Sequence, residues 1–178
     1  MGHNEWVRIQ YRPARPADVR AIAALTAPYS QRRILIAKEL IDYFEDIQEF
    51  IVAQDMDVDG EPIVGCGALH VFWDDIAEIR TLAVAPEYVG LGVGSKIFTF
   101  LEDRAREMRL KRLFCLTFEV DFFVKHGFRE IEGTPVGTDV YQEMLRSHDD
   151  GVAEFLDLAK VKPNTLGNTR MLKELDIK

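Results

Sequence analysis

The spacing of apolar residues along the chain predicts a mixture of strands and helices. Residues 7–11 alternate between apolar and polar positions as a strand does, and from Val19 onward apolar residues recur three and four positions apart, as on a helix. The same patterns predict further helices over 35–44, 95–109, 122–126 and 151–158, and strands over 49–53, 63–73, 77–84, 111–118 and 170–175. The turn-rich residues 57–60 make an antiparallel hairpin of the second and third strands. The fold class that this order predicts is α/β with a mixed sheet.

Length and composition point to one globular domain. The chain has 178 residues, 47% of them apolar and 29% charged, and no low-complexity linker divides it. The opening residues 1–6 are polar and are expected to be flexible. We therefore expect a flexible segment over 1–6 and a single domain over 7–178.

Charge, cysteines and hydropathy exclude several classes of partner. A net charge of −8 argues against nucleic acid, whose binders concentrate Lys and Arg. Cys66 and Cys115 lie in apolar runs without a CxxC spacing or a nearby His cluster, so we expect no disulfide and no metal, as in a reducing cytoplasm. The apolar stretch over 63–72 is about half as long as a membrane span, and no signal-peptide pattern precedes it. The expected location is the cytoplasm, without a membrane partner.

A glycine-rich segment, Val89-Gly90-Leu91-Gly92-Val93-Gly94-Ser95, joins a predicted strand to a predicted helix. Glycines let backbone approach a ligand closely, and the amides at a helix N-terminus suit a pyrophosphate. A flexible turn is the alternative for such a segment taken alone. The spacing differs from the dinucleotide-binding fingerprint, and no acidic ribose ligand follows at the expected distance, which disfavours a nicotinamide enzyme.

Two motifs resemble the GNAT acetyltransferase family. The segment Leu82-Ala83-Val84-Ala85-Pro86-Glu87-Tyr88 with the glycines after it is similar to that family's acetyl-CoA motif, and Phe123-Val124-Lys125-His126-Gly127-Phe128 is similar to its later F-x-x-x-G-F signature. The resemblance implies a GNAT fold and acetyl-CoA as co-substrate, with pantetheine on the strand backbone and pyrophosphate on the loop amides. The implied cofactor-binding residues are Leu82, Val84, Val89, Gly90, Leu91, Gly92, Val93, Gly94 and Ser95. Two positions depart from the family: it often has Gln or Arg at Val89 and a tyrosine acid at Phe123.

Within that family the chain resembles N-acetylglutamate synthase in its short form, which lacks an amino-acid-kinase domain. The similar stretches, in order, are 34–38, 66–69, 78–84, 113–117 and 168–170. The resemblance implies acetyl transfer to the α-amino group of L-glutamate, the first step of arginine biosynthesis. It also implies Glu78 as general base, Thr117 as general acid, and Lys38, Asn168 and Arg170 near the amino-acid substrate.

The chemistry of the residues is consistent with that implication. An amino-acid amine is mostly protonated at neutral pH and needs a base before it attacks a thioester. Strand alternation predicts that Glu78, Arg80, Leu82 and Val84 share one face. Thr117, on a neighbouring strand, could place its hydroxyl near the departing sulfur. The alternatives are an exposed strand carboxylate for Glu78 and a strand-forming threonine for Thr117.

Glutamate carries two carboxylates, so its pocket needs fixed cations. Lys38, Arg80 and Arg170 are the candidates, although each could equally be a solvated charge. Other acceptors remain open, namely glutamine, another amino acid or a polypeptide N-terminus, and so does a non-catalytic module that senses acyl-CoA. The apolar C-terminal strand favours a homodimer.

Overall fold

A computed structural model describes residues 7–161 and 167–176, so the expected flexible segment over 1–6 lies outside the described residues. Within the described part of the chain, seven strands form one sheet in the order β1-β2-β3-β4-β5-β7-β6. Only the β4–β5 pairing is parallel, and the neighbours on both sides are antiparallel. The strands are β1 (Ile9–Pro13), β2 (Phe50–Asp55), β3 (Ile63–Val71), β4 (Ile76–Val84), β5 (Arg112–Thr117), β6 (Arg129–Glu130) and β7 (Thr169–Glu174).

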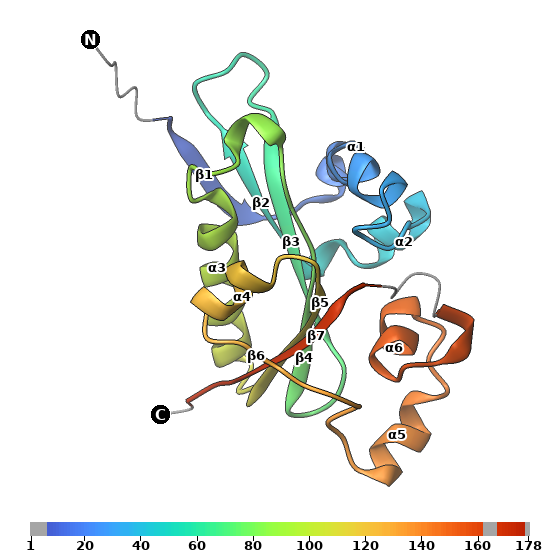
Figure 1. The fold of residues 1–178 in the computed structure, drawn as a ribbon. Helices are drawn as coiled ribbons and strands as arrows, with labels where there is room; N and C mark the ends of the chain where they lie inside the picture. Colours follow the sequence, from blue (N-terminus) through green and yellow to red (C-terminus); the bar gives the residue numbers. More distant parts are fainter. Residues whose placement is uncertain (1–6, 162–166, 177–178) are drawn as a thin grey trace.

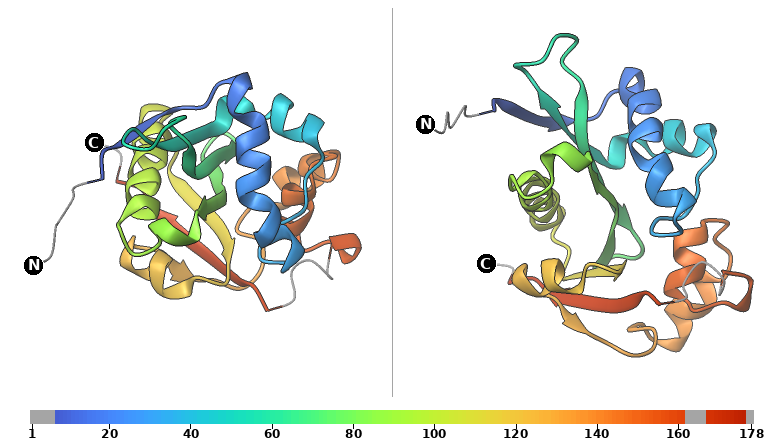
Figure 2. Two further views of the ribbon diagram at one scale, coloured as in Figure 1. Left: turned by 90° about the horizontal axis from the view of Figure 1, so that it is seen from above. Right: turned by 45° about the horizontal axis from the view of Figure 1, so that its top comes forward.

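Helices cover both faces of this sheet (Figures 1 and 2). The helices are α1 (Val19–Gln31), α2 (Leu40–Glu45), α3 (Val93–Glu107), α4 (Val120–Lys125), α5 (Thr138–Met144) and α6 (Asp150–Phe155). Helix α3 packs its apolar side on one face, while α1 and α2 pack on the other, beside α5 and α6. The core therefore lies in layers on each side of the sheet, and the mixed α/β fold class is confirmed.

The two parallel strands diverge soon after they meet. Strand β4 pairs with β5 over only three positions, and the last pair is Glu78 with Phe114. Beyond that point residues 79–84 of β4 and 115–117 of β5 are not paired with each other. Glu78 consequently lies at the vertex of an opening in the middle of the sheet.

A bulge in β4 changes which side chains share a face. The register against β3 runs from Arg80 opposite Ala68 to Ala83 opposite Cys66, so β4 carries one extra residue there. Thr81 has a φ of 55°, a left-handed conformation that is costly for a β-branched residue.

The bulge corrects the prediction that the β4 side chains from Glu78 to Val84 share one face. Leu82 and Val84 pack in the cluster beneath α3, together with Ile79. Glu78 and Arg80 point to the opposite side, where Arg80 donates a hydrogen bond to Glu78. Strand alternation was the wrong guide because one extra residue reverses the alternation after it.

The remaining expectations hold in outline, with one clear correction. The helix expected over 35–44 is confined to Leu40–Glu45, because Glu39 and Asp42 form a capping box that starts the helix there. Residues 34–38 form neither helix nor strand. Helix α5 and the short strand β6 were not anticipated, since the periodicity in that region is weak. No helix in the described ranges is long and apolar enough to cross a membrane.

Candidate active site

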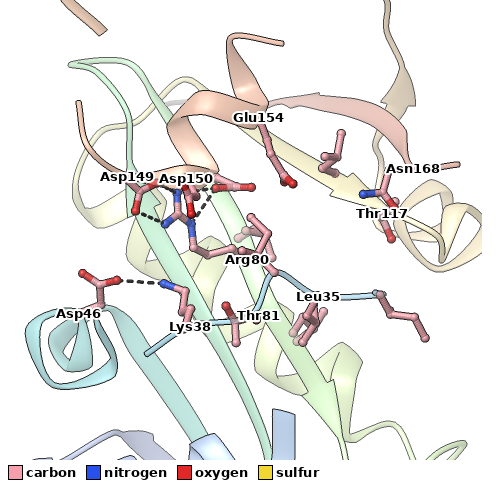
Figure 3. A pocket seen from close by; sticks show the side chains of 18 of the residues that line it. Leu35, Lys38, Asp46, Arg80, Thr81, Thr117, Asp149, Asp150, Glu154 and Asn168 are labelled. Atoms are coloured by element: carbon pink, nitrogen blue, oxygen red, sulfur yellow. Dashed lines mark hydrogen bonds and ion pairs between the residues drawn. The ribbon is translucent and has the colours of Figure 1, made fainter. Parts of the chain in front are cut away.

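A cavity of about 360 Å³ occupies the opening between β4 and β5. Its walls come from six places along the chain: the irregular residues 34–38 with helix α2, residues 78–82 of β4, residues 116–118 around the end of β5, Phe123 of α4, residues 148–154 around α6, and Asn168 before β7 (Figure 3). The bulge at Thr81 and the shortened α2 both shape this space, because Thr81 and the irregular segment line it. The cavity is thus a product of the irregular parts of the fold.

A buried network of three charged side chains forms one wall. Arg80 Nε donates to Glu78 Oε2 at 2.7 Å, and its two terminal nitrogens donate to the two oxygens of Asp149 at 2.9 Å (Figure 3). Burial disfavours the charge on Arg80, but the two carboxylates outweigh burial and raise the pKa of the guanidinium. Burial acts to raise the pKa of Asp149, but Arg80 outweighs burial and holds that pKa well below its usual range. Arg80 therefore acts here as the partner of Glu78 and Asp149, with little donor capacity left for a substrate.

Glu78 is well placed for proton transfer. Its side chain is buried in a residue that is only 5% exposed, and it lines the cavity at the vertex of the diverging strands. Only Oε2 receives a hydrogen bond from the described residues, which leaves Oε1 for a proton from a bound amine.

Lys38 lines the opposite side of the cavity and is also paired. Its Nζ lies 3.0 Å from Oδ2 of Asp46, and both side chains are mostly buried. Lys38, the expected cation, therefore lies at the cavity. An anionic group of a substrate would have to compete with the Asp46 carboxylate for it.

Thr117 and Asn168 lie together on a third side of the cavity (Figure 3). The Thr117 hydroxyl accepts a hydrogen bond from the backbone N–H of Glu119 at 2.8 Å. A hydroxyl that accepts in this way still has its own hydrogen to donate. Thr117 can therefore donate into the cavity from a fixed position.

Arg170 does not line the cavity, in contrast to its expected place beside the substrate. Its guanidinium donates to the backbone carbonyls of Gly133, Glu154 and Phe155 and stacks over Phe114. Two of those carbonyls belong to the end of α6, whose last carbonyls have no partner within the helix. Arg170 thus anchors α6 from behind, and the substrate contact implied by the resemblance is not formed by the side chain as it stands.

Glu154 is a site residue that the sequence reasoning missed. It projects from α6 into the cavity, its residue is 4% exposed, and Oε1 has no hydrogen-bond partner among the described residues (Figure 3). Asp149 was missed as well, although its position one residue before α6 is typical of an N-cap, and its side chain does accept from Val152 N–H. No local pattern distinguishes Glu154 from an exposed helical carboxylate.

The glycine-rich segment forms an uncapped helix start. Gly90 and Gly92 have φ values of 85° and 81°, and a Cβ at either position would meet open space. Gly92 is the N-cap of α3, no side chain caps that end, and the first helical backbone bond runs from Lys96 N–H to Gly92. The amides of 93–95 therefore have no acceptor within the helix, as a pyrophosphate site requires.

The two departures from the family pattern have different surroundings. Val89 is 64% exposed beside the glycines. Phe123 is 5% exposed, packs edge-on against Phe98 and Phe128, and also lines the cavity. Phe123 brings no proton to the site.

Neither cysteine is suited to act as a nucleophile. Burial raises the pKa of Cys66 to about 12 and that of Cys115 well above its usual value. Among the described residues, no group of three or more His, Cys, Asp or Glu side chains is arranged to hold a metal ion.

Comparison with known proteins places the chain in a family. Residues 17–128 match the acetyltransferase (GNAT) family, and the chain belongs to that family. It is an acyltransferase, and acetyl-CoA is its co-substrate. The alternative of a non-catalytic module that senses acyl-CoA is therefore set aside.

Among its relatives is the amino-acid acetyltransferase of Mycobacterium tuberculosis, 55% identical over 161 residues, which are 90% of this chain and 91% of that protein. The amino-acid acetyltransferase of Neisseria meningitidis serogroup A is 33% identical over 124 residues, 68% of this chain but 27% of that longer protein.

Two solved structures are similar to this chain. The crystal structure of Rv2747 from Mycobacterium tuberculosis, in complex with CoA and NLQ, matches with a TM-score of 0.90 and 53% identity, over 94% of this chain and 99% of that one. The N-acetylglutamate synthase of Neisseria gonorrhoeae, complexed with coenzyme A and N-acetyl-glutamate, matches with a TM-score of 0.74. Its identity is 24%, over 97% of this chain and 36% of that one, so this second likeness concerns the fold.

Proposed function

We propose that this chain transfers the acetyl group of acetyl-CoA to the α-amino group of L-glutamate, the first step of arginine biosynthesis, in the cytoplasm. The observation that carries the proposal is the polar cavity at the divergence of β4 and β5, with Glu78 at its vertex. The 55% identity to an amino-acid acetyltransferase supports an amino acid as the acceptor. We also propose a homodimer as the working form, although Met171 and Leu172 of the C-terminal strand pack in this chain's own core.

The cofactor-binding assignment rests on the start of α3. The uncapped amides of 93–95 and the open space around Gly90 and Gly92 fit a pyrophosphate group. The backbone of Leu82 and Val84 would face pantetheine in the opening, although the Val84 carbonyl already accepts a hydrogen bond from Tyr29.

Three side chains divide the chemistry between them. Glu78, directly or through one water, takes a proton from the acceptor ammonium, and the free amine then attacks the thioester carbonyl. Thr117 donates a hydrogen bond to the sulfur as the C–S bond breaks, and the second proton that the nitrogen loses is taken up by the departing thiolate. Lys38 attracts a carboxylate of the acceptor, in competition with Asp46.

Glutamine is a second candidate acceptor, favoured by the charge of the cavity. Two cations, Lys38 and Arg80, line the cavity, and each already has a carboxylate within 3.0 Å. The carboxyl side chains that line it number seven: Asp42, Glu45, Asp46, Glu78, Asp149, Asp150 and Glu154. This excess attracts an ammonium group and disfavours a second carboxylate on the acceptor, which glutamine lacks.

A thiol-release assay against the twenty amino acids tests the proposal, with product masses to confirm N-acetylation. We expect the highest kcat/KM for glutamate or glutamine. Thiol release that no amino acid raises above the background, or release only with peptide N-termini, would overturn the proposal.

A further inference from the structure

Glu154 combines burial, orientation and a missing partner. Its residue is 4% exposed, its carboxyl points into the cavity between Arg80 and Thr117, and Oε1 receives no hydrogen bond from the described residues (Figure 3). Leaving a buried polar atom unpaired costs roughly 1–3 kcal/mol, so the Glu154 side chain has hydrogen-bonding capacity that the fold itself does not use.

Charged groups on three elements face this carboxyl. Burial acts first to disfavour its ionised form, Glu78 on β4 and Asp150 on α6 act in the same direction, and Arg80 on β4 and Arg170 on β7 oppose them. The balance raises the pKa of Glu154 to about 8. At neutral pH it is therefore a neutral carboxyl that can donate a hydrogen bond, which no carboxylate in the cavity can do.

The position of Glu154 is fixed by the fold. Arg170 Nη1 donates to the Glu154 carbonyl at 3.0 Å and Nη2 donates to that of Phe155 at 2.5 Å, so β7 holds the end of α6 from behind. The residue is thus held across the cavity from the strands that diverge at Glu78.

We propose that Glu154 determines which acceptor the chain prefers. Its neutral carboxyl donates a hydrogen bond to the side-chain carboxylate of glutamate. Its ionised carboxylate repels glutamate and accepts a hydrogen bond from the side-chain amide of glutamine. This inference rests on the proposed amino-acid acetylation. A neutral carboxyl and a carboxylate form a short, charge-assisted bond, whereas two carboxylates at that distance repel each other. The amide of glutamine has both a donor and an acceptor and can pair with either form of Glu154.

The test is the ratio of kcat/KM for glutamate to that for glutamine, measured at pH 7, 8 and 9 with saturating acetyl-CoA. The neutral fraction of a carboxyl with a pKa near 8 falls about tenfold between pH 7 and pH 9, so the wild-type ratio should fall about tenfold. In Glu154→Gln, an amide N–H is present at every pH, and the ratio should stay within about twofold. Glu143→Gln, the same change on the exposed side of α5, should follow the wild type.

Three results would overturn the proposal. A wild-type ratio that stays constant with pH, or an equal loss for both acceptors, would mean that Glu154 does not distinguish their side chains. A loss of kcat above about 100-fold for both acceptors in Glu154→Gln would make Glu154 the base instead. If neither amino acid is acetylated, the proposed function fails and this inference fails with it. The pH dependence of the wild-type ratio tests the proposal even if Glu154→Gln does not fold.

Discussion

Replacing Glu154 with Gln should stabilise the folded chain, increasingly so as the pH rises. The folded state holds the Glu154 proton more tightly than the unfolded state, because its pKa is raised from 4.5 to about 8. Well below pH 4.5 both states are protonated, and ionisation of the carboxyl then makes no difference to the free energy of unfolding. As the pH rises to about 8, the unfolded state ionises first, and the free energy of unfolding of the wild type falls by as much as about 5 kcal/mol.

Urea unfolding of wild type and Glu154→Gln at pH 5, 7 and 9 measures this cost. Other titrating groups are common to both proteins, so the difference between their free energies of unfolding isolates Glu154. We expect this difference to grow by about 3–5 kcal/mol between pH 5 and pH 9. Glu143→Gln should show no such trend, since Glu143 is exposed. Parallel pH dependence of wild type and Glu154→Gln would mean that the pKa of Glu154 is not raised in the folded chain.

Three other substitutions test separate parts of the site. Gly92→Asp should abolish acetyl-CoA binding in calorimetry with the fold kept. Gly60→Asp, at a residue with a similar φ of 82° and equal open space, should leave binding unchanged. Unchanged binding in Gly92→Asp would exclude the glycine-rich segment as the pyrophosphate site. Lys38→Met should raise the KM for glutamate by about tenfold or more. Asp46→Asn releases Lys38 from its ion pair and should not raise this KM. If the KM of Lys38→Met stays within about twofold of wild type, Lys38 does not contact the substrate. Thr117→Val should lower kcat by about tenfold or less, because the hydroxyl assists a thiolate leaving group that is already stable. Thr117→Ser keeps the hydroxyl and should retain activity. A wild-type kcat in Thr117→Val would exclude Thr117 as the hydrogen-bond donor to the sulfur.

The sequence predicts the parts of this site that are local. The glycine-rich segment lies directly between β4 and α3, so its backbone conformation and position follow from residues next to each other. Glu78 and Thr117 were found from two strands whose neighbourhood the family resemblance implied. Both line the cavity.

The parts that sequence reasoning missed depend on irregular backbone and on distant contacts. One extra residue at Thr81 turned Leu82 and Val84 to the other face of the sheet, and a bulge leaves no periodic signal. Glu154 comes to the cavity because Arg170 ties α6 to β7, a contact that spans 16 residues and that no pattern along the chain records. The shortened α2 likewise reflects its capping box, whose two members are acidic residues with no apolar period.

In the proposed reaction, an acceptor amine loses its proton to Glu78 at the vertex of β4 and β5. The most direct test of this step is kcat of Glu78→Gln at pH 7 and pH 9, alongside calorimetry with acetyl-CoA. We expect kcat at pH 7 to fall by roughly 10²- to 10⁴-fold with acetyl-CoA affinity unchanged, and to recover partly at pH 9, where more of the amine arrives deprotonated. A kcat near that of the wild type at pH 7, in a folded Glu78→Gln protein that binds acetyl-CoA normally, would contradict the account.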